Sequence, residues 1–233
     1  MMLMKYLKQV FLFLRILPFS LFFCLKYLPF RKAIKIPILL YRPRFITLKG
    51  KITVENPSFG MVRLGFHTVP IYPNAGFVWD NKGGEVVFKG CCNIGNASAI
   101  SVEKNARLIF GDHFEATTQF KCVCHYFITF SYQVCFGWNC IVVDTDFHKL
   151  SSLKGVVKRG YAPVFVGCYN WFAMNCVLLK GTITADHCVV GANTILTGKY
   201  DLPYSLIIGN PAKIKATGMY RDFSNDKIIF EKD

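Results

Sequence analysis

The chain has 233 residues, and Lys plus Arg outnumber Asp plus Glu by 28 to 14, which gives a formal net charge of +14. This length suffices for one domain with a substantial core, and the charge indicates a polyanionic partner such as nucleic acid, anionic lipid or a phosphorylated cofactor. The ten cysteines do not fit a small disulfide-stapled domain, because the chain is too long and lacks CxxC metal-binding spacing. Free cysteines used as small hydrophobic side chains imply a reducing, cytoplasmic compartment.

Residues 1–35 combine Lys and Arg with Leu, Phe and Ile. That mixture suits an anionic membrane surface better than a nucleic-acid groove, so we expect no nucleic-acid partner. The apolar run over residues 16–25 is about half the ~20 residues that a spanning helix needs, and it contains Pro18. We therefore expect one or two short helices that lie on the inner face of the membrane. The alternative is a helical cap packed against the domain that follows.

We expect one β domain over residues 45–217, followed by a tail over residues 218–233. From about Lys49 onward helical periodicity is lost, and Val, Ile, Phe, Thr, Cys and Gly predominate. In the second half a six-residue repeat emerges. Its first position is mostly apolar and branched, as expected for side chains that point into a narrow prism: Val166, Phe172, Leu178, Thr184, Val190 and Leu196. Four residues later comes a small or compact side chain: Asn170, Cys176, Thr182, Cys188 and Thr194.

The same period continues upstream, with slips of register near Ile100 and Leu108 that we interpret as bulges or corner loops. We assign four cysteines to the small buried position of the repeat: Cys122, Cys140, Cys176 and Cys188. A six-residue unit is too short for a hairpin or a βαβ crossover, so each unit must be one short strand and a turn, with three units to a coil. The pattern matches an all-β fold, a left-handed parallel β-helix of hexapeptide repeats, preceded by a short helical N-terminal segment.

Three motifs resemble the hexapeptide-repeat acyltransferases, in particular the branch of maltose, galactoside and capsular-polysaccharide O-acetyltransferases. Residues 167–173 (GCYNWFA) look like the family's IGNNVWIG element, and residues 179–196 are similar to its LKGVTIGDNVVIGAGSVV coils. Residues 208–214 (IGNPAKI) match the closing AGNPAKII almost letter for letter. This likeness implies an acyl transfer from acetyl-CoA to a hydroxyl of a saccharide or glycan, with no metal, in a homotrimer whose sites lie between neighbouring helices.

A further motif, DTDFH over residues 144–148, lies ahead of the tryptophan element. In this branch a loop that ends in a histidine carries the general base there, so the resemblance implies that His148 is the catalytic base. Histidine titrates near neutrality, which suits this role. Either Asp144 or Asp146 can hold the second imidazole nitrogen, and the sequence does not choose between them. The alternative for His148 is a surface-loop histidine without a role.

The resemblance also implies the residues that bind the acyl donor. Trp171 would lie beside the donor groove, with Ala192 and Gly209 in the closing coils and three lysines near the phosphates of coenzyme A: Lys199, Lys213 and Lys215. The alternative for Trp171 is a structural role at a corner of the coils, and the alternative for each lysine is an ordinary solvated position on the surface. Gly198 is an extra residue beside Lys199 relative to the family's VTKD spacing.

Two other functions compete with acyl transfer. A γ-type carbonic anhydrase would need three histidines around zinc, and the only conceivable set, His113, His125 and His148, lacks the close pairing of two ligands. A non-catalytic, membrane-associated β-helix scaffold would have no reason to keep a loop histidine, a flanking tryptophan and the closing motif.

Overall fold

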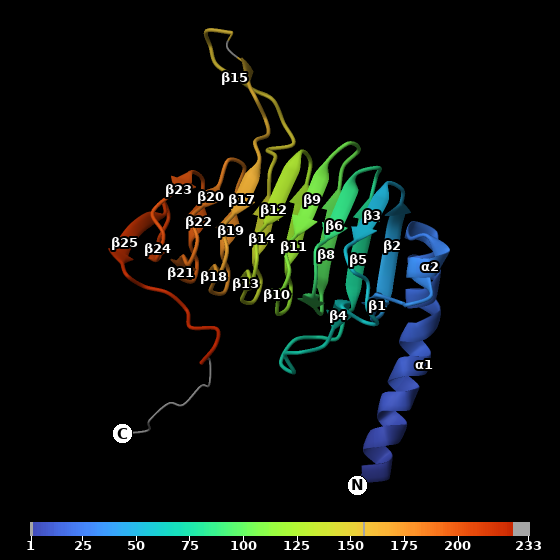
Figure 1. Ribbon diagram of the computed structural model, residues 1–233. Coiled ribbons are helices and arrows are strands. Elements are labelled where there is room, and N and C mark those ends of the chain that lie inside the picture. The colour runs from blue at the N-terminus through green and yellow to red at the C-terminus, as the bar shows by residue number, and fades with distance from the viewer. Residues whose placement is uncertain (1, 156, 226–233) are drawn as a thin grey trace, which may run out of the picture.

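The computed structural model describes residues 2–155 and 157–225, and three sheets of parallel strands wind around one axis (Figure 1). Each coil strand pairs with the equivalent strand of the next coil, three places further along the chain, or five where the β15–β16 hairpin intervenes, so that three strands make one coil. The fold is a left-handed parallel β-helix, as the six-residue period predicts. We call its faces sheets 1, 2 and 3 in the order in which the chain visits them.

The strands are distributed as follows. Sheet 1 has nine strands: β1 (Ile38–Leu40), β4 (Val62–Phe66), β7 (Cys92–Gly95), β10 (Phe114–Ala116), β13 (Cys135–Phe136), β18 (Trp171–Phe172), β21 (Val189–Val190), β24 (Ser205–Ile208) and β25 (Lys213–Thr217). Sheet 2 has seven: β2 (Pro43–Leu48), β5 (Phe77–Asn81), β8 (Ser98–Val102), β11 (Lys121–Cys124), β14 (Ile141–Val143), β19 (Val177–Leu178) and β22 (Ile195–Leu196). Sheet 3 also has seven: β3 (Lys51–Val54), β6 (Glu85–Phe88), β9 (Arg107–Phe110), β12 (Phe127–Phe130), β17 (Val164–Val166), β20 (Ile183–Thr184) and β23 (Lys199–Tyr200). A separate hairpin is formed by β15 (Leu150–Ser151) and β16 (Val157–Lys158), and β25 closes the helix by pairing antiparallel with β24.

Each corner of the late coils has one residue with positive φ, so this requirement recurs every six residues. Tyr169, Asn175, Gly181, His187 and Asn193 have φ of 57°, 61°, 79°, 59° and 58°. Asn and Gly adopt this left-handed conformation most easily, which explains their place in the repeat. At Tyr169 and His187 ring stacking supports the corner, because the two rings lie 4.6 Å apart and nearly parallel.

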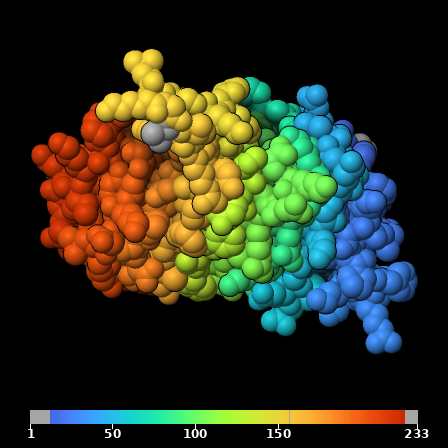
Figure 2. Space-filling model, turned by 90° about the horizontal axis from the view of Figure 1, so that it is seen from above, coloured from blue at the N-terminus to red at the C-terminus, as the bar shows by residue number. Residues whose placement is uncertain are grey.

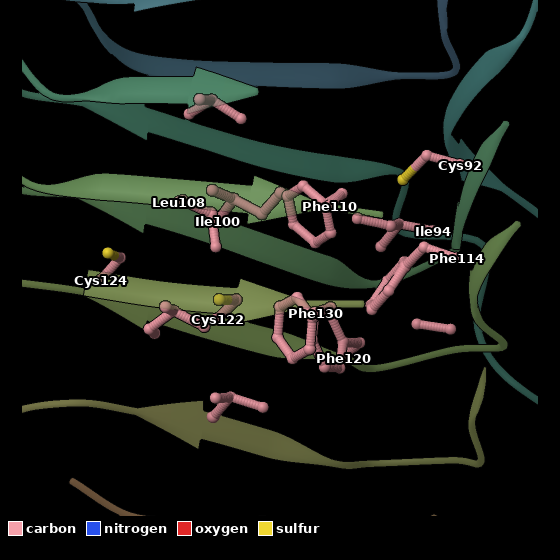
Figure 3. Close-up of a cluster of buried hydrophobic side chains, with 14 of the residues drawn as sticks. Cys92, Ile94, Ile100, Leu108, Phe110, Phe114, Phe120, Cys122, Cys124 and Phe130 are labelled. Carbon is pink, nitrogen blue, oxygen red and sulfur yellow. The ribbon is translucent and has the colours of Figure 1, made fainter. Parts of the chain in front are cut away.

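The core is a column of side chains inside the prism (Figure 3). Phe110 stacks on Phe88 at 5.3 Å and on Phe130 at 5.4 Å between ring centroids, so phenylalanines of successive coils form a continuous stack. Phe136 and Phe172 repeat this stacking further along, at 4.4 Å. All side chains at both inward positions of the repeat between residues 166 and 196 are buried, which confirms that assignment.

The assignment of Cys122 to the small position was wrong. Cys122 pairs with Val142, and Val142 pairs with Leu178, so Cys122 occupies the first inward position, and Phe120 fills the small one. Cys140 and Cys176 do share the small position, because their carbonyl groups accept equivalent bonds from neighbouring coils. Cys122 and Cys140 lie in adjacent coils and differ by two residues in register, and the upstream slips of the repeat hid that difference.

The N-terminal segment is one long helix and one short helix, whereas we expected one or two short helices. Helix α1 (Met2–Tyr27) runs through Pro18, and α2 (Phe30–Ala33) follows it. The first strand begins at Ile38, earlier than the expected domain start at residue 45. Within the residues the structure describes, no helix has the length and apolarity needed to cross a membrane.

The second half of α1 caps the open end of the β-helix (Figure 1). The Ser20 hydroxyl accepts a bond from the backbone N–H of Leu40 at 2.9 Å, and the fully buried Phe23 meets Trp79 edge to face at 5.1 Å. The Tyr27 hydroxyl donates to the carbonyl of Lys49 at 3.1 Å. The first coil of a solenoid has no preceding coil to cover it, so α1 supplies the missing apolar cover.

Candidate active site

Residues 144–163 leave the coils at the corner between β14 of sheet 2 and β17 of sheet 3. They form the β15–β16 hairpin, which projects from the body (Figure 1, gold) and points toward the viewer in the view from above (Figure 2, yellow). The other late corners between these two sheets are tight turns, so this excursion is a distinct structural feature.

Asp144 anchors the start of the hairpin. Its carboxylate is fully buried and accepts the backbone N–H groups of His125 at 2.7 Å and of Tyr126 and Phe127 at 2.8 Å. A carboxylate that accepts three amide hydrogens has little capacity left for a histidine ring. Asp144 therefore holds the hairpin to the preceding coil, and its position does not match the expected role of orienting His148.

Asp146 forms an ion pair with Lys180 of the next coil. The Lys180 ammonium also donates to the carbonyl of Arg159 at 3.2 Å, so one lysine joins both strands of the hairpin base to the coils. The backbone N–H of Asp146 donates to the carbonyl of Gly160 at 2.7 Å. Among the described residues, neither aspartate forms a hydrogen bond with the imidazole of His148.

His148 lines a cavity of about 440 Å³ between the hairpin and the coils. Other residues of this cavity lining are His125, Thr145, Phe147, Lys149, Val157, Lys158, Arg159, Gly160 and Tyr161. The Arg159 guanidinium lies 4.1 Å from the ring centre of Tyr161 and 5.1 Å from that of Tyr126. The volume falls in the range of about 300–1,000 Å³ typical of small-ligand sites.

Most of the residues expected to bind the acyl donor lie away from the hairpin, along sheet 1 and the corner between sheets 1 and 2. Trp171 is on β18 of sheet 1, half-buried between Cys135 and Val189 of the adjacent strands. Ala192 and Gly209 lie on the corner between sheets 1 and 2, and Lys213 and Lys215 lie on β25.

Lys199 is the exception among the expected donor residues. It starts β23 of sheet 3, on the same side of the prism as the hairpin. The structure therefore brings together five of the six expected donor residues along sheet 1 and its corner, and separates them from His148 and Lys199.

The C-terminal segment turns back along sheet 1 after β25. The Arg221 guanidinium lies 5.5 Å from the ring centre of Trp171 and 4.6 Å from that of Phe223. Tyr220 meets His187 and Tyr204 edge to face. Arg221 is thus a cation placed beside Trp171, in the part of the chain that was expected to be only a tail.

The histidines do not assemble a metal site. His113 lies at the corner between sheets 3 and 1, away from the corner that carries His148. Over the described residues, no cluster of three or more His, Cys, Asp or Glu side chains is arranged to hold a metal ion.

Sequence reasoning missed several residues of this region. His125, Tyr126 and Tyr161 come from separate turns, and their rings meet only because the hairpin folds back onto the β11–β12 corner. The partner of Asp146 is 34 residues away. One signal was available: residues 147–163 contain four basic residues and no acidic one.

Six-residue units wound into three parallel sheets, interrupted by one projecting hairpin, define a hexapeptide-repeat β-helix protein. No family model matches the chain. A protein named "Probable acetyltransferase Rv3034c" from Mycobacterium tuberculosis is 28% identical over 81 residues, which are 32% of this chain and 25% of that protein. One named "Putative acetyltransferase SACOL2570" from Staphylococcus aureus is 33% identical over 69 residues, 30% of this chain and 32% of that protein. The resemblance to acetyltransferases is confirmed, although the matched segments span only a quarter to a third of these relatives.

Among solved structures, the polysialic-acid-specific acetyltransferase NeuO shares 14% identity, with a TM-score of 0.43 over 80% of this chain and 85% of that chain. The polysialic acid O-acetyltransferase OatWY shares 17% identity, with a TM-score of 0.40 over 80% of this chain and 74% of that chain.

Proposed function

We propose that the protein is an acyl-CoA-dependent O-acyltransferase that moves an acetyl group from acetyl-CoA to a hydroxyl of a saccharide or glycan. The observation that carries this proposal is the position of His148, exposed in a cavity on the hairpin that interrupts the coils. The closing motif over residues 208–214 and the names of the curated relatives support the same reaction class.

In this mechanism His148 removes the proton from the acceptor hydroxyl as its oxygen attacks the thioester carbonyl. The C–O bond forms, the tetrahedral oxyanion collapses, and the C–S bond breaks. The imidazolium then returns the proton to the leaving thiolate, so that coenzyme A and the acetyl ester are released. We assign Asp144 and Asp146 to positioning the hairpin, because their carboxylates bind the backbone of residues 125–127 and Lys180.

The donor groove would lie along sheet 1 and its corner, with Trp171, Ala192, Gly209, Lys213 and Lys215. Gly209 has φ of 101°, a conformation that L side chains rarely adopt, so the backbone can approach a ligand closely there. Arg221 adds a cation beside Trp171, and Lys199 is left outside this groove.

A single copy places the base and the donor groove on different edges of the prism. We therefore propose a homotrimer in which the hairpin of one copy faces sheet 1 of its neighbour, so that each site takes its base from one chain and its donor contacts from the next. Cyclic, head-to-tail contacts of this kind close into rings.

We further propose that α1 holds the enzyme on the inner, anionic face of a membrane. The side of the helix opposite its packed face exposes Leu14, Phe19, Phe22 and Leu25, whose exposed fractions are 47–59%. Exposed Arg and Lys side chains flank these residues: Arg15, Lys26, Arg31, Lys32 and Lys35. Apolar side chains with flanking cations fit an acidic lipid surface.

Thiol release from acetyl-CoA with a panel of saccharides tests the proposed reaction. We expect His148→Ala to lower turnover by about two to four orders of magnitude with the fold intact, which is the usual effect of removing a general base. His113→Ala, which changes a histidine at the corner between sheets 3 and 1, is the matched control and should keep its activity. Turnover of His148→Ala within a few-fold of the parent would remove His148 from the mechanism, and no release with any acceptor would favour the scaffold alternative.

A further inference from the structure

The hairpin that carries His148 is strongly basic. Lys149, Lys154, Lys158 and Arg159 are all exposed on it, and residues 147–163 contain no Asp or Glu. Lys149, Lys158 and Arg159 line the same cavity as His148. Three cations therefore surround the proposed base on a single excursion from the coils.

The nearest acidic groups do not neutralise these cations. The Asp144 carboxylate is buried against three backbone N–H groups, and the Asp146 carboxylate is paired with Lys180. No carboxylate belongs to the described lining of the cavity. The cavity thus keeps a positive potential that only a ligand or a partner can offset.

Arg159 is exposed, and its side chain packs over two tyrosine rings. Its guanidinium lies over the rings of Tyr161 and Tyr126, and its backbone carbonyl accepts a bond from Lys180. The pKa of Arg159 is raised by hydrogen bonding to Tyr161, so the group stays charged. A fixed, planar guanidinium can bind a carboxylate or phosphate with two parallel hydrogen bonds at a low entropic cost.

We propose that this cavity binds an anionic group of the acceptor, so that the substrate is an acidic saccharide that carries carboxylate or phosphate groups. This inference rests on the proposed acyl transfer, because it assigns the cavity to the acceptor. Binding the anion at Lys149, Lys158 and Arg159 would place a neighbouring sugar hydroxyl beside the imidazole of His148, which lines the same space.

The test is isothermal titration of the full-length protein with three oligosaccharides of equal length. The probes are hexagalacturonate for carboxylate groups, phosphorylated maltohexaose for phosphate groups, and neutral maltohexaose. We expect at least one anionic probe to bind about tenfold or more tighter than neutral maltohexaose, and its affinity to fall as salt rises from low to physiological concentration. The better anionic probe identifies the acidic group.

The decisive variant is Lys149→Gln/Lys158→Gln/Arg159→Gln. We expect it to weaken the anionic probe by about tenfold or more and to leave the neutral probe unchanged. The control Lys51→Gln/Lys89→Gln/Lys104→Gln removes the same number of positive charges from exposed positions on earlier coils and should change nothing. The double variant Lys149→Gln/Lys158→Gln keeps Arg159 on its tyrosines and should lose an intermediate amount, which guards against a folding artefact.

The same titrations with acetyl-CoA separate acceptor from donor. An unchanged affinity of the triple variant for acetyl-CoA supports the acceptor assignment, whereas an equal loss would mean that these cations hold the donor's phosphates and would overturn it. Equal binding of neutral and anionic probes would also overturn it. If hexagalacturonate binds through the hairpin but no thiol is ever released, the proposed transfer fails while the anion site stands.

Discussion

The coils over residues 164–208 and the hairpin over residues 144–163 are held together by different kinds of contact. In the coils each strand pairs with the equivalent strand of the next coil, and the inward side chains are buried inside the prism. In the hairpin the side chains turn outward, and their contacts are with specific groups such as Lys180 and Tyr126. Periodic sequence therefore builds the scaffold, and the break in the period supplies the side chains for chemistry.

The most direct test of this contrast removes the Asp144 carboxylate, whose hydrogen bonds join the hairpin to the coils. We expect Asp144→Ala to lower the free energy of unfolding by about 2–4 kcal/mol, because three backbone N–H groups lose a charged acceptor. Asp146→Ala is the matched control and should cost less than about 1 kcal/mol, because its ion pair is partly solvent-exposed. Urea denaturation measures both, and equal losses would show that Asp144 does not anchor the hairpin.

Inside the coils, two cysteines test whether the two inward positions differ. Cys176 donates its thiol hydrogen to the carbonyl of Gly191 at 3.2 Å, and Thr182 at the equivalent position donates to Leu179 at 2.7 Å. Cys176→Ser should therefore cost less than about 1 kcal/mol of unfolding free energy. Cys122 is fully buried at the other inward position, so Cys122→Ser should cost about 1–3 kcal/mol. The reverse order would mean that the two positions are alike.

Thiol labelling provides an independent check of the same assignment. Burial raises the pKa of the Cys188 and Cys122 thiols, which lowers their thiolate fraction at neutral pH. The exposed Cys91 should react with a thiol-specific reagent first, and both buried thiols only after unfolding. Rapid labelling of Cys188 in the native protein would contradict the register of the last coils.

The smallest expected effects belong to the exposed cations of the N-terminal helices, which can be tested separately from the buried side chains of the cap. Lys26→Gln and Arg31→Gln should each weaken sedimentation with anionic liposomes by about 1 kcal/mol at low salt, and less at high salt. Phe23→Ala, which removes a buried ring of the cap, should instead lower the unfolding free energy by about 3–5 kcal/mol. Liposome binding that changes neither on loss of these cations nor with the salt concentration would contradict an electrostatic membrane contact.

The sequence predicted the last coils well, because six-residue spacing forces Val166 through Leu196 to point inward. The sequence did not predict contacts between residues that are far apart in the chain. Lys180 was read only as part of a coil, yet it pairs with Asp146. Likewise, Pro18 suggested a break in the first helix, but the helix continues through it because Ser20 and Phe23 pack on the first coil. The six-residue repeat of the sequence predicts which residues lie in the sheets. The hairpin and the N-terminal cap depend on tertiary contacts that do not repeat along the sequence.

The central claim is that the hairpin of one copy supplies the base for the donor groove of a neighbouring copy. Co-expression of His148→Ala with Trp171→Ala/Lys213→Ala/Lys215→Ala tests it directly by thiol release from acetyl-CoA. Each variant alone should be nearly inactive, and the randomly assembled population should recover about a quarter of the parent's activity per site, because the base is intact in half of the sites and the groove, independently, in half. Mixtures that are no more active than the two variants measured separately would contradict a site shared between copies.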